Sequence, residues 1–199
     1  MKGSRSPSVQ MPVLSGASGG DIAESLASIL GMDHCHLESR RFPDGEAYVK
    51  VPSGAIESLR SETVILVSNT YPDSGIMQTV LLLGAINDVR RGDLSNLKGE
   101  GEQHMDDVGQ GVILAIPYYG YARQDKRFSP GEAISARVIA DVLAESCDGI
   151  VILDLHAPGV LEGMSLPIEF VSSMPEIADS LHNEVVVGAG LKLLLEEKI

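Results

Sequence analysis

Basic residues and long apolar runs are scarce in this 199-residue sequence. It contains 15 Lys and Arg residues and 28 Asp and Glu residues, which gives a formal charge of −13. A negatively charged surface repels the phosphates of DNA and RNA. No apolar stretch is long enough to span a bilayer, and residues 1–10 lack the apolar core of a signal peptide. We therefore expect a cytoplasmic protein that binds neither nucleic acid nor membranes.

Tryptophan is absent and cysteine is rare. Aromatic residues make up only 4% of the chain, so Leu, Ile, Val and Ala must pack most of the core. The two cysteines, Cys35 and Cys147, form neither a disulfide framework nor a zinc motif. Cys35 lies between His34 and His36, which could suggest a metal site, but we favour a strand with both histidines on one face.

Short apolar runs alternate with helical patterns along the chain. Strands that are apolar on both faces are typical of parallel sheets, so the sequence predicts an α/β fold with a mostly parallel sheet flanked by helices. The predicted strands are 13–15, 34–39, 47–51, 63–67, 112–116, 150–153, 168–171 and 185–187, and the predicted helices are 21–30, 72–91, 133–145 and 175–181.

The spacing of apolar residues predicts which side of each helix faces the core. Pro43-Asp44-Gly45 is typical of a turn, so strands 34–39 and 47–51 are expected to form a hairpin with a charged tip. The polar segment 92–110 is expected to be a mobile loop. The inward positions are Ile22, Leu26, Ile29 and Leu30 in the first helix, Met77, Val80, Leu81, Leu83 and Ala85 in the second, and Ile134, Val138, Ile139, Val142 and Leu143 in the third.

Ligands of open parallel sheets bind beyond the carboxyl ends of the strands, and three polar segments follow predicted strand ends. They are residues 68–70, 118–128 and 154–156. The second carries Arg123, Lys126 and Arg127, which could hold phosphates, although a solvated charged loop fits the composition equally well.

His156 could ligate a divalent metal or serve as a hydrogen-bonded structural histidine, and its place at a strand end favours the first. The glycine-rich turn at 16–20 matches neither common phosphate-loop motif. Asp44 and Glu46 alone are more typical of solvated surface charges than of a site.

Several segments resemble, in the same order and with similar spacing, motifs of the phosphoribosyl pyrophosphate synthetases, also called ribose-phosphate diphosphokinases. Residues 41–46 (RFPDGE) resemble their R-F-x-D-G-E element, and residues 116–127 (IPYYGYARQDKR) resemble their I-P-Y-x-x-Y-A-R-Q-D-[RK]-[RK] stretch. Residues 153–156 (LDLH) are similar to their V-D-[LI]-H, and 14–18 and 130–135 also fit. The resemblance implies a phosphoribosyltransferase-like (Rossmann-like) domain.

The resemblance also implies a chemistry and a set of site residues. The family transfers a diphosphate from Mg-ATP to ribose 5-phosphate, giving phosphoribosyl pyrophosphate for nucleotide biosynthesis, and it forms homo-oligomers in which dimers build hexamers. A neighbouring subunit often supplies the hairpin contacts. The implied contacts are Phe42, Asp44 and Glu46 with the adenine and ribose of ATP, Arg123, Gln124 and Asp125 with ATP, and His156 with magnesium.

By the same resemblance the chain divides into a flexible N-terminus (1–10), an N-terminal domain (11–183) and the start of a second phosphoribosyltransferase-like domain (184–199). The family's catalytic Lys/Arg loop and its ribose-phosphate loop have no counterpart among the 199 residues, so we expect the isolated chain to be inactive. The leading hypothesis is a truncated family enzyme. The alternatives are a non-catalytic regulatory subunit that retains ATP binding and a nonfunctional fragment.

Overall fold

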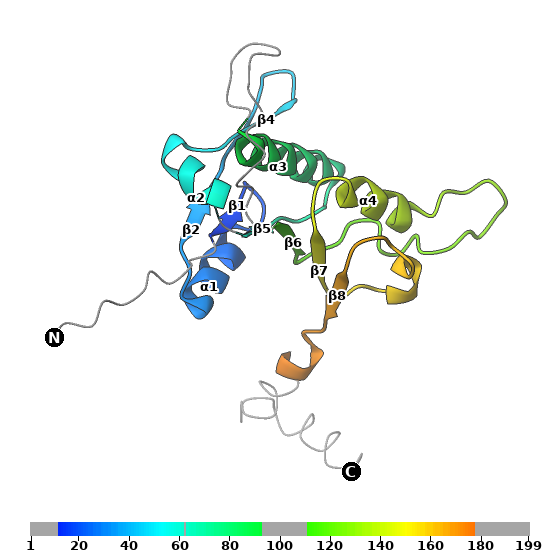
Figure 1. The fold of residues 1–199 in the computed structure, drawn as a ribbon. Coiled ribbons are helices and arrows are strands. Elements are labelled where there is room, and N and C mark those ends of the chain that lie inside the picture. Colours follow the sequence, from blue (N-terminus) through cyan, green and yellow to red (C-terminus); the bar gives the residue numbers. More distant parts are fainter. Residues whose placement is uncertain (1–11, 62, 93–110, 178–199) are drawn as a thin grey trace, which may run out of the picture.

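Six parallel strands organise the chain, whose computed structural model describes residues 12–61, 63–92 and 111–177 (Figure 1). The strand order is β2-β1-β5-β6-β7-β8, and each neighbouring pair is parallel. This confirms the predicted α/β class. The strands are β1 (Val13–Ser15), β2 (His34–His36), β5 (Val64–Val67), β6 (Val112–Ile116), β7 (Gly149–Leu153) and β8 (Ile168–Val171).

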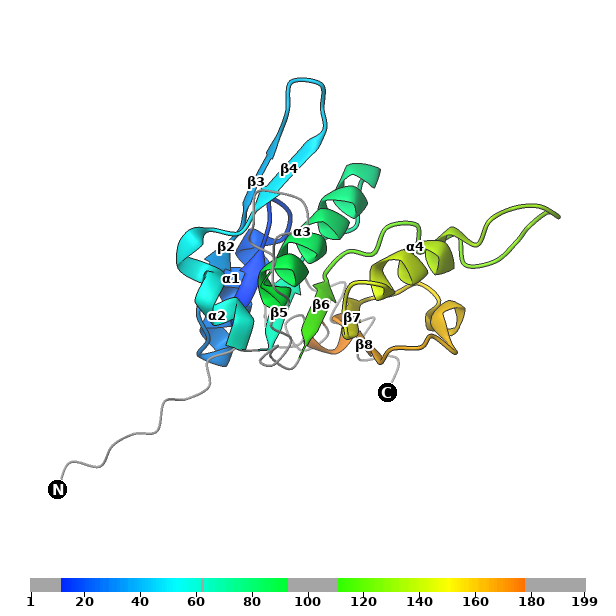
Figure 2. The ribbon, with the colours of Figure 1, turned by 45° about the horizontal axis from the view of Figure 1, so that its top comes forward.

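The predicted hairpin is present as a second, two-stranded sheet that stands away from the first (Figure 2). It consists of β3 (Glu38–Arg41) and β4 (Ala47–Lys50), which pair in antiparallel register. The prediction of one continuous strand at 34–39 is therefore wrong, because these residues belong to two strands in different sheets, β2 and β3. The chain changes sheets at Leu37, which is fully buried and donates its N–H to the Ser15 carbonyl at 2.7 Å.

Helices cover the two faces of the parallel sheet. α1 (Gly20–Leu30) packs on β1 and β5 through one small core cluster, while α3 (Asp73–Arg91) and α4 (Ser135–Ala144) contribute to the larger cluster. Gly31 and Gly92 end α1 and α3 in the left-handed conformation that glycine adopts without strain. The short elements η1 (Ser53–Ala55), α2 (Ile56–Ser61) and η3 (Pro158–Leu161) were not predicted.

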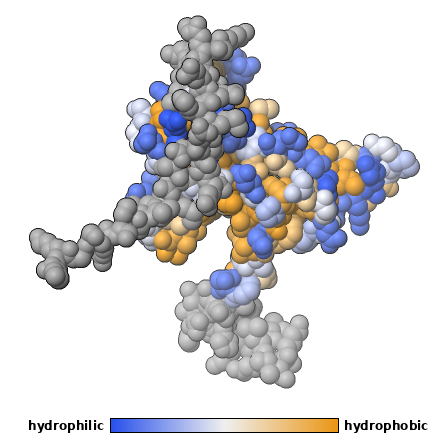
Figure 3. All heavy atoms as spheres, viewed as in Figure 1, coloured by the Kyte–Doolittle hydropathy of each residue, from blue (hydrophilic) through white to orange (hydrophobic). Residues whose placement is uncertain are grey.

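The predicted inward faces of the helices were only partly correct. In α1 the buried residues are Ala23 and Ala27, whereas Ile22, Ile29 and Leu30 are 48%, 82% and 46% exposed. Figure 3 shows apolar residues at the surface where α1 lies. Small side chains let a helix backbone approach a sheet closely, and a pattern built on large apolar residues overlooks them.

The other two helices repeat this difference. α4 buries Ala136, Ala140 and Leu143 and leaves Val138 and Val142 about half exposed. α3 buries Leu83 as predicted, with Val80 and Ala85 partly buried against the core, but Met77 is 56% exposed. Its other buried apolar residues are Leu82, Ile86 and Val89.

His34 and His36 lie on one face of β2, as the strand interpretation predicts. The Ser15 hydroxyl lies 2.9 Å from His34 Nε2 and 3.3 Å from His36 Nδ1. Within the three described ranges, no helix is both long and apolar enough to cross a membrane. Of the expected loop over 92–110 the structure describes only Gly92, at the end of α3. The rest of that loop, the strand at 185–187 and the domain boundary at 183 fall outside those ranges and stay predictions.

Candidate functional site

A pocket of about 570 Å³ opens at the carboxyl ends of β6 and β7. Arg123 and His156, which sequence reasoning assigned to a phosphate site and a metal site, both line it. The structure thus brings together residues that are 33 positions apart in the chain. The full lining is Tyr71, Pro117, Tyr118, Tyr119, Tyr121, Ala122, Arg123, Leu153, Asp154 and His156.

The segment that carries Arg123 is fixed to the connection between β5 and α3. The Asn69 side-chain oxygen accepts the Tyr118 N–H at 2.9 Å, and the Thr70 hydroxyl oxygen accepts the Gly120 N–H at 2.8 Å. In return the Thr70 N–H donates to the Tyr118 carbonyl at 3.1 Å. In the sequence, residues 68–70 stand out only because they follow a strand. No motif predicts that Asn69 and Thr70 hold the segment that carries Arg123.

Tyr121 is held at both its backbone and its side chain. Its φ of 61° lies in the left-handed region, which bulky residues rarely occupy, and its carbonyl accepts the Gln124 N–H at 2.9 Å. Its hydroxyl donates to a carboxylate oxygen of Asp73 at 2.7 Å. That hydrogen bond and the negative charge of Asp73 raise the pKa of the Tyr121 phenol.

Gln124 has a structural contact at the start of α4. Its side-chain oxygen accepts the Ser135 hydroxyl at 2.9 Å, and its carbonyl accepts the Ala136 N–H at 3.3 Å. The amide NH₂ of Gln124 is the end of the side chain that could donate a hydrogen bond to a ligand. Gln124 and the half-buried Asp125 are not among the residues that line the pocket.

The remaining cations of this loop do not reach the pocket. Lys126 Nζ lies 5.4 Å from the centre of the Phe128 ring, and Arg127 Nε donates to the Glu132 carbonyl at 2.8 Å. The Glu132 carboxylate accepts the N–H groups of Phe128 and Ser129 at 2.7 and 3.0 Å. The loop before α4 extends away from the sheet (Figure 2). Of the three cations that sequence reasoning grouped, only Arg123 lines the pocket.

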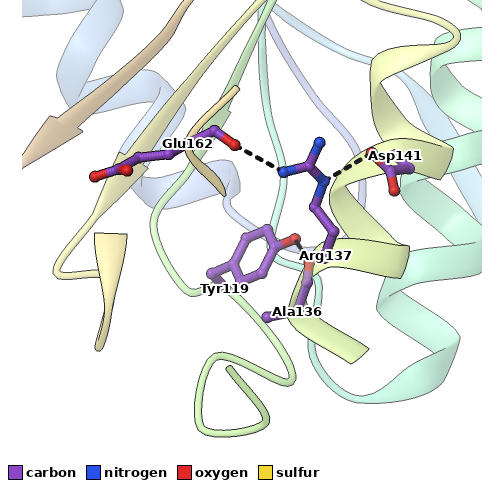
Figure 4. Close-up of polar contacts among 5 residues, drawn as sticks. All are labelled: Tyr119, Ala136, Arg137, Asp141 and Glu162. Atoms are coloured by element: carbon purple, nitrogen blue, oxygen red, sulfur yellow. Dashed lines mark hydrogen bonds and ion pairs between the residues drawn. The ribbon is translucent and has the colours of Figure 1, made fainter. Parts of the chain in front are cut away.

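Tyr119, which lines the pocket, is hydrogen-bonded to the start of α4, while Arg137 makes contacts at the surface of that helix (Figure 4). Tyr119 is 4% exposed, and its hydroxyl donates to the Ala136 carbonyl at 2.7 Å. Arg137 contacts the Asp141 carboxylate at 3.1 Å and donates to the Glu162 carbonyl at 2.9 Å. Burial raises the pKa of Tyr119, so its hydroxyl remains a donor.

Asp154 and His156 follow β7. Asp154 has a φ of 49°, and its N–H donates to the Val171 carbonyl of β8 at 2.8 Å. Its carboxylate accepts both the Ser173 N–H, at 2.9 Å, and the Ser173 hydroxyl, and these hydrogen bonds lower the pKa of Asp154. His156 is exposed, and the described residues contain no group of three or more metal-ligating side chains.

The hairpin residues lie apart from the pocket of the same chain. Phe42 is 40% exposed and meets the Tyr48 ring edge to face at 5.7 Å, and the Arg40 guanidinium lies 4.1 Å from the centre of the Tyr48 ring. Asp44 accepts the Glu46 N–H at 3.1 Å within the turn. Neither Phe42, Asp44 nor Glu46 lines the pocket.

A second pocket of about 530 Å³ lies at the glycine-rich turn before α1. It is lined by His34, His36 and Asn69, but also by the acidic Asp21 and Glu24. Two carboxylates would repel a phosphate, so the first pocket is the better candidate.

Comparison with known proteins gives a consistent result. Residues 11–91 and 108–146 match the family described as the N-terminal domain of ribose phosphate pyrophosphokinase. The ribose-phosphate pyrophosphokinase of Methanothermobacter thermautotrophicus is 35% identical over 162 residues, which cover 80% of this chain and 49% of that protein. The Halobacterium salinarum protein of the same name is 30% identical over 169 residues, covering 85% and 52%.

The fold is shared with a solved structure. The phosphoribosylpyrophosphate synthetase from Mycobacterium smegmatis superposes with a TM-score of 0.68 at 21% identity, over 88% of this chain and 52% of that one. The chain spans about half the length of the curated relatives it matches.

Proposed function

The chain belongs to the ribose phosphate pyrophosphokinase family through its match to the N-terminal domain, and from this premise we propose that it supplies the ATP-binding half of a diphosphate transferase. In the proposed reaction the anomeric hydroxyl of ribose 5-phosphate attacks the β-phosphorus of ATP. The bond from that phosphorus to the oxygen that bridges it to the α-phosphate breaks, AMP leaves with the bridging oxygen, and the hydroxyl loses its proton. The product, phosphoribosyl pyrophosphate, feeds nucleotide biosynthesis, for which the cytoplasm is the fitting location.

One observation carries the proposal: Arg123 and His156 line the same pocket at the carboxyl ends of adjacent parallel strands. Ligand sites of open α/β sheets occur at this edge. Diphosphate transfer depends mainly on positioning and on neutralising oxygen charge. Arg123 supplies a planar guanidinium that can bind two phosphate oxygens at once.

The chemistry of the pocket also suits magnesium held by few protein ligands. Mg²⁺ favours oxygen donors and usually keeps phosphate and water oxygens around it, and when bound it would neutralise charge on the diphosphate. His156 would offer one nitrogen from the protein side. The pocket volume of about 570 Å³ is in the range of small-molecule sites.

The hairpin fits a role in a homo-oligomer. The hairpin β3–β4 stands away from the parallel sheet (Figure 2), and Phe42, Asp44 and Glu46 do not line the pocket of their own chain. Both observations support contact with the adenine and ribose of ATP bound to a neighbouring copy. Gln124 and Asp125 would complete the ATP contacts beside Arg123. The curated relatives carry the name of the enzyme, which favours an enzyme over a regulatory subunit.

Calorimetric titration of Mg-ATP into the 199-residue chain tests the proposal. Arg123→Ala removes the cation that lines the pocket, and Arg127→Ala is the matched control, because it removes an equal charge from the same loop outside the pocket. We expect Arg123→Ala to weaken binding about tenfold or more, since a hydrogen bond to a charged group contributes about 1.5–3 kcal/mol. Wild-type affinity in Arg123→Ala, or equal losses in both variants, would contradict the proposal.

A further inference from the structure

Two non-glycine residues of the described chain have positive φ angles: Tyr121 at 61° and Asp154 at 49°. Both line the candidate pocket. Each also stands two positions before a proposed ligand-binding residue, Tyr121 before Arg123 and Asp154 before His156. The left-handed region is sterically costly for a bulky residue such as Tyr121 and less so for aspartate, and its occurrence before both proposed ligand-binding residues directs attention to the contacts of these two side chains.

In each case the side chain anchors the turn to a segment from another part of the sheet. The Tyr121 hydroxyl donates to Asp73, which opens α3 after β5. The Asp154 carboxylate accepts two hydrogen bonds from Ser173, which follows β8. The backbone of each turn is bonded as well, by Gln124 N–H to the Tyr121 carbonyl and by Asp154 N–H to the Val171 carbonyl.

We propose that Tyr121 and Asp154 are paired positioning residues, whose anchored left-handed turns direct Arg123 and His156 into one pocket. Backbone strain persists where the surrounding structure over-determines it, and it clusters at ligand sites. A preorganised site loses less conformational entropy when its ligand binds. The inference rests on the proposed function, because it assigns the two turns to the ATP and magnesium groups of that site.

The proposal also gives the Asp154 carboxylate a defined role. An aspartate that lines a pocket two residues from His156 would ordinarily be taken as a second metal ligand. Here both of its oxygens accept hydrogen bonds from Ser173, so we assign the carboxylate to orienting the turn that carries His156. Removing a group that orients a metal ligand typically changes metal affinity by about 10- to 100-fold, and Asp154 would act on His156 through the backbone of the turn that its bonds to Ser173 hold.

Four variants of the full chain separate anchoring from other effects. Tyr121→Phe removes the hydroxyl that reaches Asp73, and Asp154→Ala removes the carboxylate that reaches Ser173. Asp154→Asn is the conservative variant, because asparagine tolerates positive φ and keeps an acceptor for the Ser173 N–H. Asp141→Asn is the control, since Asp141 is an exposed carboxylate on α4 whose contact is to Arg137, away from the pocket.

Two readouts are needed: amide hydrogen exchange without ligand, and ATP affinity with and without Mg²⁺. We expect faster exchange at 119–127 in Tyr121→Phe and at 153–160 in Asp154→Ala, with wild-type rates in Asp141→Asn. Tyr121→Phe should weaken ATP binding about tenfold at every Mg²⁺ level. Asp154→Ala should instead reduce the Mg²⁺-dependent gain in affinity about tenfold or more, and Asp154→Asn should restore most of it.

Unchanged exchange in both anchor variants overturns the proposal. So does altered exchange accompanied by wild-type ATP affinity and Mg²⁺ dependence, because the turns would then be structural only. If wild-type protein binds no ATP, the proposed function fails with the positioning role assigned under it, while the exchange rates still show whether the two side chains anchor their turns.

Discussion

Replacing Gly120 by Ala is the sharpest test of how the Arg123 loop is held. A β-carbon added to Gly120 would lie 2.1 Å from the carbonyl oxygen of Thr70, whereas real contacts of this kind essentially never fall below 3.0 Å. The neighbouring atom is backbone, so it cannot rotate away. One of the two segments must therefore move by about 0.9 Å or more.

The expected cost follows from what that movement disturbs. The hydrogen bonds from Gly120 N–H to Thr70 and from Thr70 N–H to Tyr118 join the same two segments at 2.8 and 3.1 Å. Overpacking typically costs about 1–3 kcal/mol, and each weakened hydrogen bond adds about 1 kcal/mol. With both hydrogen bonds weakened, we expect Gly120→Ala to lower the free energy of unfolding by about 3–5 kcal/mol.

Urea unfolding measures that loss, and Gly84→Ala is the matched control. Gly84 lies inside α3, and a β-carbon there would meet no atom within 4 Å, so the control should gain about 0.5–1 kcal/mol from helix propensity. ATP titration of Gly120→Ala should show weaker binding as well, because Arg123 follows three residues later. A Gly120→Ala protein as stable as Gly84→Ala would refute the tight contact between the segments.

The remaining predictions concern His156 and Cys147. His156→Ala should reduce the magnesium dependence of ATP binding while leaving binding without metal nearly unchanged; an unaltered magnesium dependence would return His156 to a structural role. For Cys147, burial and then the charge of Asp148 raise the pKa of the thiol from 9.0 to about 11. The unfolded thiol ionises first, so stability should fall as pH rises from about 9 to 11. Urea unfolding at several pH values should show this decline, and Cys147→Ala should make it shallower; identical slopes for both proteins would show that Cys147 contributes nothing.

The parallel sheet could be predicted because each strand is indicated by an apolar run within its own few residues. Apolar runs such as 64–67 and 112–116 show a strand without reference to the rest of the chain. The end of the first helix before Gly31 was recognisable for the same reason, since glycine accepts the left-handed conformation. The rule that ligands bind at carboxyl strand ends then selected Arg123 and His156, and the structure places both in one pocket.

The supporting residues of the pocket could not be predicted in this way. The contacts of Asn69 and Thr70 with residues 118–120 join segments about 50 positions apart, and many polar residues after strands make no such contacts. The positive φ of Tyr121 and Asp154 accompanies side-chain contacts with Asp73 and Ser173, and no local pattern in the sequence shows those contacts. Lys126 and Arg127 share the local charge pattern of Arg123, and only the path of the loop separates them.

The passage of the chain from β2 to β3 takes place at Leu37, inside the core rather than at the surface. The Leu37 side chain is fully buried and its N–H is hydrogen-bonded to Ser15 of β1, so the backbone at this residue is held in place. The base of the hairpin is therefore fixed to the sheet, and we expect that enlarging or trimming Leu37 would change the direction in which the hairpin leaves the sheet.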